Sequence, residues 1–67
     1  MKQKEIKNLA RKIAKYERIV QTSDDEHLVR QAQEKIMELT NSVHSFEDMV
    51  AIDELVMELL EKNLKIS

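Results

Sequence analysis

The chain has 67 residues, of which 36% are charged, 42% hydrophobic and 3% aromatic, and its formal net charge is −2 at pH 7. It contains no cysteine, glycine or proline, which excludes disulfides, thiolate metal sites and glycine-rich phosphate loops and disfavours tight β-hairpins. This length suits one small domain with a modest core. We therefore expect a single helical domain over residues 1–67 in a reducing compartment, the cytoplasm.

Residues 3–21 are expected to form the first helix. At helical spacing its apolar residues fall on one side: Ile6, Leu9, Ile13, Tyr16 and Val20. The opposite side carries five cations, here called the basic row: Lys4, Lys7, Arg11, Lys15 and Arg18. Such a row is a candidate face for a polyanion or an acidic protein partner, and it is equally typical of a solvated helix surface.

The second helix is expected over residues 24–41. Ser23 with Glu26 three residues later predicts a capping box at its start, and the acidic run between them suits the positive end of the helix dipole. Asp24 and His27 have the spacing of a metal-ligand pair, but a site needs further ligands, so we expect no metal. The apolar stripe of this helix is narrow: Leu28, Val29, Ala32, Ile36, Leu39 and Val43.

The third helix is expected over residues 46–64, with Ser45 as its cap. Its apolar residues span about 220° of the circumference, more than packing on two neighbours requires. The surplus, at Val50 and Met57 on one side and Leu55 on the other, indicates either a well-buried helix with partly exposed edges or, as we prefer, a second apolar surface for another copy or another protein. The candidate interface residues are Met49, Val50, Asp53, Val56, Met57, Leu60 and Leu64. Asp53 is interpreted either as a selector of the partner or as a polar residue at a wet edge.

Three helices of similar length with short connections predict an all-α fold, a small antiparallel three-helix bundle. We expect no enzymatic activity, cofactor or small-molecule substrate, because no catalytic constellation is recognisable and the domain is small. No apolar run approaches the length of a membrane span, so no membrane attachment is expected. The preferred function is a binding or regulatory module that contacts a protein partner, or forms a homo-oligomer, through the third helix. The alternative is an RNA- or DNA-associated accessory protein that uses the basic row.

Overall fold

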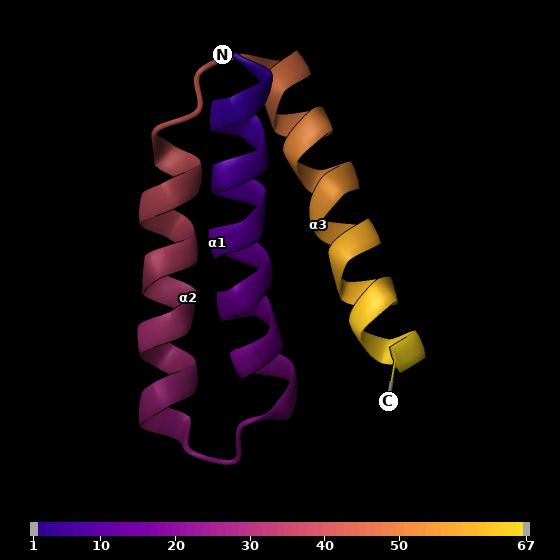
Figure 1. Ribbon diagram of the computed structural model, residues 1–67. Coiled ribbons are helices and arrows are strands. Elements are labelled where there is room, and N and C mark those ends of the chain that lie inside the picture. Colours follow the sequence, from indigo (N-terminus) through magenta and orange to yellow (C-terminus); the bar gives the residue numbers. More distant parts are fainter. Residues whose placement is uncertain (1, 67) are drawn as a thin grey trace.

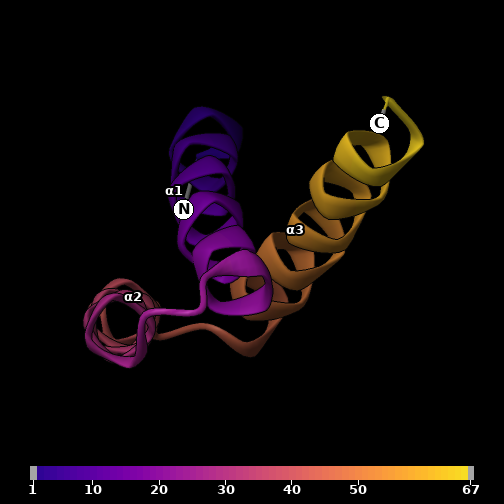
Figure 2. The same cartoon turned by 90° about the horizontal axis from the view of Figure 1, so that it is seen from below.

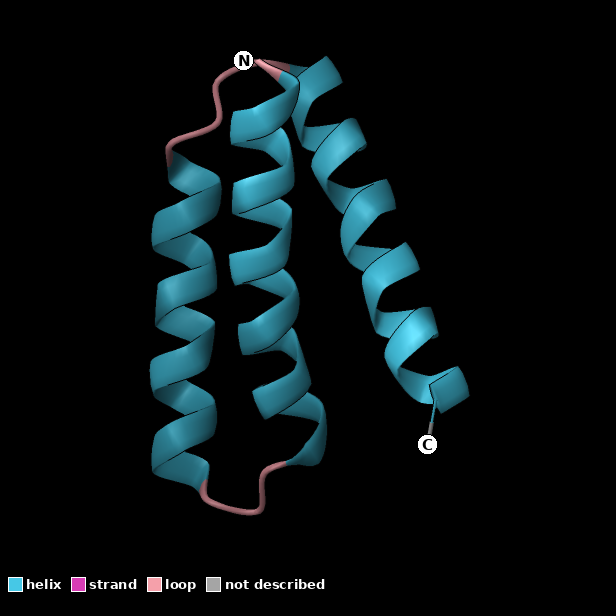
Figure 3. Cartoon of the chain, in the orientation of Figure 1, coloured by secondary structure: helices cyan, strands magenta, loops and turns pink. Residues whose placement is uncertain are grey.

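The computed structural model describes the backbone of residues 2–66 and the side chains of residues 2–62. It consists of the helices α1 (Gln3–Thr22), α2 (Glu26–Asn41) and α3 (Phe46–Ile66), and the described residues form no strand. Consecutive helices run in opposite directions (Figure 1), joined by short connections (Figure 3). The predicted antiparallel three-helix fold is confirmed, and every expected helix end lies within two residues of the observed one.

The connection between α1 and α2 differs from the expected capping box. Ser23 closes α1, because its backbone N–H donates to the carbonyl of Ile19 at 2.8 Å. The N-cap of α2 is Asp25, whose Oδ1 accepts from the backbone N–H of His27 at 2.9 Å. The prediction of Ser23 as the cap was therefore wrong by two residues. The Ser23 hydroxyl instead accepts from the N–H of Asp25 at 3.2 Å, which shapes the turn.

The connection between α2 and α3 covers residues 42–45. The Ser42 hydroxyl donates to the carbonyl of Leu39 at 2.7 Å, so a polar side chain satisfies an open acceptor at the end of α2. Ser45 directly precedes α3, and its carbonyl accepts from the N–H of Met49 at 3.1 Å. This is the backbone bond of an N-cap residue, so Ser45 occupies the position predicted for it.

The core lies around α1, which contacts both other helices, whereas among the described residues α2 and α3 hardly contact each other. Ala10 and Ala14 are small and buried, which lets α3 approach closely with Ile52 and Val56. The Cα trace measures 34 × 27 × 15 Å, so the molecule is flat. Seen from below, α3 is inclined to α1 and ends away from it (Figure 2). As a result, α3 packs on one side only and keeps a second side open.

None of the helices, over the residues described, combines the length and apolar character needed to cross a membrane.

Candidate protein-binding surface on α3

Three large apolar side chains of α3 are exposed on the same side of the helix. Phe46 is 82% exposed, Met57 63% and Val50 39%. Together with Asp53 and the half-buried Leu60 they follow one another at alternating intervals of four and three residues. At 100° per residue these positions fall within an arc of about 80°, as in the seam of a coiled coil. We call the five residues the α3 seam: Phe46, Val50, Asp53, Met57 and Leu60.

The structure divides the predicted interface residues between this seam and the core. Val56 is only 7% exposed and packs in the core, and Met49 is half-buried. Leu64 continues the seam spacing, but its side chain lies outside the described residues. Phe46 was not among the predicted interface residues, although its spacing of four from Val50 is visible in the sequence.

The wide apolar arc of α3 thus serves two purposes. Ile52 and Val56, with the partly buried Leu59, form the half that packs on α1. The seam forms the other half: Phe46, Val50, Asp53 and Met57 are exposed, whereas Leu60 is partly buried and packs against the core. Because α2 hardly contacts α3 in the described part of the chain, no third helix covers this half.

An acidic edge borders the seam. Glu47, Glu54 and Glu61 directly follow Phe46, Asp53 and Leu60, and all three glutamates are exposed. In heptad terms each glutamate occupies the position that flanks the seam on one side. On the other side the flanking residues are Met49, which is half-buried, and Val56, which belongs to the core. We call Glu47, Glu54 and Glu61 the acidic edge.

Asp53 is the one polar position within the seam. Its side chain is exposed, and within residues 2–62 it forms no ion pair with a cation of α1 or any other described residue. The carboxylate is open to solvent as long as nothing covers the seam. A partner that covers the seam must supply a hydrogen-bond donor there, since a buried unpaired charge is strongly unfavourable.

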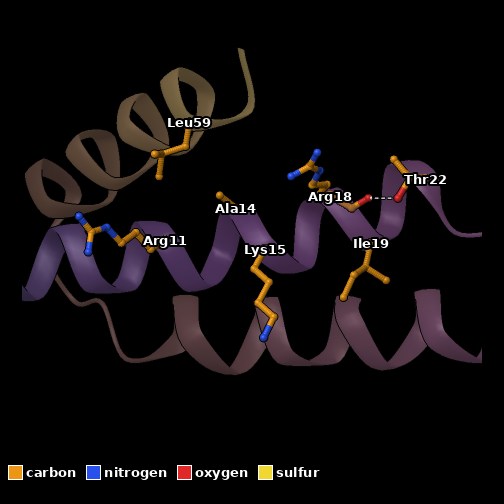
Figure 4. A pocket seen from close by; sticks show the side chains of 7 residues that line it. All are labelled: Arg11, Ala14, Lys15, Arg18, Ile19, Thr22 and Leu59. Carbon is orange, nitrogen blue, oxygen red and sulfur yellow. Dashed lines mark hydrogen bonds between the residues drawn. The ribbon is translucent and has the colours of Figure 1, made fainter. Parts of the chain in front are cut away.

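All five side chains of the basic row are exposed, as the sequence predicts for a helix back. Arg11, Lys15 and Arg18, in the second half of α1, line an open pocket to which α3 contributes Leu59 (Figure 4). Leu59 extends from α3 toward α1, whereas Lys15 extends toward α2. Between α1 and α3 the pocket therefore combines the apolar Ala14 and Leu59 with the cations Arg11 and Arg18.

The first half of the basic row lies beside carboxylates of α3. Lys7 and Arg11 line one groove together with Glu58, and Lys7 lines the adjoining groove together with Glu54. Opposite charges of α1 and α3 are thus neighbours within one molecule. This proximity lowers the positive potential along α1, although the groups are exposed and separated by solvent.

The side chains at the start of α2 are engaged in local bonds. Asp25 caps the helix, and Nε2 of His27 lies 3.3 Å from the side-chain nitrogen of Gln31. Among the described residues, no group of three or more histidine, cysteine, aspartate or glutamate side chains is arranged to hold a metal ion. Asp24 and His27 are therefore not joined by a further ligand in the part of the chain described.

No protein-family model matches the chain, and no curated protein or solved structure matches it.

Proposed function

We propose that this chain is a small non-catalytic binding module, acting in the cytoplasm, that binds a helical segment of a protein partner through the α3 seam. The observation that carries the proposal is the exposure of Phe46, Val50 and Met57 along one side of one helix. Isolated exposed apolar residues are ordinary, whereas three large ones on the same side of one helix favour a contact surface. Full burial of each such side chain is worth about 1.5–3 kcal/mol.

The spacing of the seam favours a helix as the occupant. Intervals of four and three residues place each side chain where a second helix offers a hole for it. Peptide helices that bind in this way present anchors at the same intervals. Met57 suits the role because its flexible side chain adapts to a partner, and Phe46 offers a large aromatic anchor.

The size of the core supports the same proposal. The largest fully buried side chain is Ile52, and most other core members are alanines or a valine. A chain of this length gains considerable stability from an additional packed surface. A helix lying on the seam would add a further packed layer next to Val56 and Leu60, which already contribute to the core.

The alternative function, association with RNA or DNA through the basic row, has a weaker basis. Exposure of all five cations supports it, and Arg11 and Arg18 are suited to bind phosphate with two hydrogen bonds. However, Glu54 and Glu58 lie beside the first half of the row and would repel a phosphate backbone. We therefore place this function second.

The proposal is tested by selecting displayed amphipathic helical peptides on the immobilised protein and measuring their affinities by fluorescence anisotropy. Met57→Glu should weaken binding by about tenfold or more, because it places a charge in the seam. Met37→Glu is the matched control, since Met37 of α2 is 64% exposed, almost the same as Met57.

Retention of affinity by Met37→Glu with loss in Met57→Glu would support α3 as the binding surface. Equal losses in the two variants would contradict it. Failure to enrich any helical peptide, with a protein that stays monomeric in sedimentation equilibrium, would refute the proposed function itself.

A further inference from the structure

We infer that the partner helix is basic: the seam accepts an amphipathic helix of another protein with lysine or arginine along the edge that meets Glu47, Glu54 and Glu61. This inference rests on the proposed function and specifies the chemistry of the partner. It also disfavours the α3 seam of a second copy as the occupant.

The first argument comes from the acidic edge. Residues that flank a helical seam lie close to the flanking residues of the partner helix, and their charges select partner and orientation. In α3 every described flanking position on this side of the seam is a glutamate, and all three are exposed, although Glu54 also lines a groove with Lys7 of α1. A partner with cations at the facing positions gains up to three charge pairs, whereas an acidic partner is repelled along the whole edge.

The second argument concerns pairing between copies. In an antiparallel pair of α3 helices, the acidic edge of one copy would face the acidic edge of the other, which places like charges together. In a parallel pair, each acidic edge would instead face Met49 and Val56 of the other copy, and these residues are half-buried or buried in its own bundle. Neither arrangement satisfies the glutamates, so charge opposes the pairing of two α3 seams.

The third argument comes from Asp53. This carboxylate sits within the seam and has no ion-pair partner among the described residues. A covering helix would bury it, and an unpaired buried carboxylate is costly. A lysine or arginine at the facing position removes this cost and fixes the register of the partner, which is the best-attested role of a polar group in an apolar seam.

The test uses three synthetic helical peptides with one common apolar heptad seam. They carry lysine, glutamine or glutamate at both sets of flanking positions, so either orientation is sampled. Binding of each labelled peptide to the full chain is measured by fluorescence anisotropy at about 0.15 M salt. We expect the lysine peptide to bind about tenfold or more tightly than the glutamate peptide, with the glutamine peptide in between.

The double variant Glu54→Lys/Glu61→Lys should reverse this order, since it changes the sign of most of the acidic edge. The control Glu34→Lys/Glu38→Lys produces the same change in net charge at two exposed positions of α2, away from that edge. It should leave the order of the three peptides as it is in the unaltered protein. Circular dichroism of each variant shows whether it is folded.

Four outcomes separate the two proposals. Preference for the lysine peptide, reversed only by the edge variant, supports the inference. Equal binding of the three peptides overturns the inference and leaves the proposed function standing. The same reversal in the control variant would mean that the preference depends only on the net charge of the protein, and it would also overturn the inference. Absence of binding by every peptide would overturn the proposed function together with the inference.

Discussion

At the scale of single residues, Asp25 is the side chain whose loss should be most informative about the turn between α1 and α2. Its carboxylate accepts from the N–H of His27 at 2.9 Å and so satisfies an open donor at the start of α2. We expect Asp25→Ala to lower the free energy of unfolding by about 0.5–2 kcal/mol. Ser23→Ala should lower it less, because Ser23 does not cap α2. Urea denaturation followed by circular dichroism compares the two, and a larger loss in Ser23→Ala would contradict the observed cap.

The same residues show why the sequence alone could not identify the N-cap of α2. The run from Thr22 to Asp25 contains four residues that are all good helix caps, so local preference does not choose among them. The position of the cap is decided by where α1 ends, because the backbone N–H of Ser23 is already bonded to the carbonyl of Ile19. In the candidate site, Val56 and Met57 are likewise two residues that the sequence alone cannot distinguish. Both belong to the wide apolar arc, and only the position of α1 decides that Val56 is buried and Met57 exposed.

At the scale of the elements, the backbone amides of α1 should be the best protected against hydrogen exchange. It is packed on both sides, by α2 and by α3, whereas each of those helices packs mainly on α1. Within α3, the stretch around Ile52 and Val56 is buried and the helix then departs from α1 (Figure 2). We expect backbone amides of residues 58–62 to exchange with solvent about tenfold faster than those of residues 52–56 or the centre of α1. Native-state hydrogen exchange followed by NMR measures this. Uniform exchange along all three helices would instead mean that the chain opens only as one unit.

The helices themselves were predictable, and their arrangement was predictable only in part. Periodic apolar residues and polar stop signals gave the three helices, since both act within a few residues of the chain. The narrow stripe of α2 agrees with a helix that packs mainly on α1, and the wide arc of α3 agrees with one that has an additional apolar side. The flat arrangement, in which α2 and α3 hardly contact each other over the described residues, depends on long-range packing that helical periodicity does not encode.

At the scale of the whole molecule, charge is segregated along the chain and brought together again by folding. Residues 1–21 carry a net charge of +5 and residues 44–67 a net charge of −4. Packing of α3 on α1 places Glu54 and Glu58 beside Lys7 and Arg11. The basic row, which appears in the sequence as an uninterrupted cationic face, is thus accompanied by carboxylates along part of its length. A nucleic-acid backbone would meet both signs of charge on this side of the molecule.

We accordingly expect only weak, non-specific binding of RNA. A labelled RNA duplex titrated with the protein at about 0.15 M salt should show a Kd no tighter than about 10⁻⁴ M, the weak end of non-specific association. Glu58→Gln removes a carboxylate next to Lys7 and Arg11, and Glu34→Gln removes an exposed one on α2. At low salt the first variant should strengthen binding by about twofold to threefold more than the second, because its carboxylate lies within a Debye length of the row. Fluorescence anisotropy across a salt series measures both effects. Micromolar binding by the unaltered protein at physiological salt, weakening steeply as salt is raised, would make the basic row a polyanion site and the α3 seam a secondary feature.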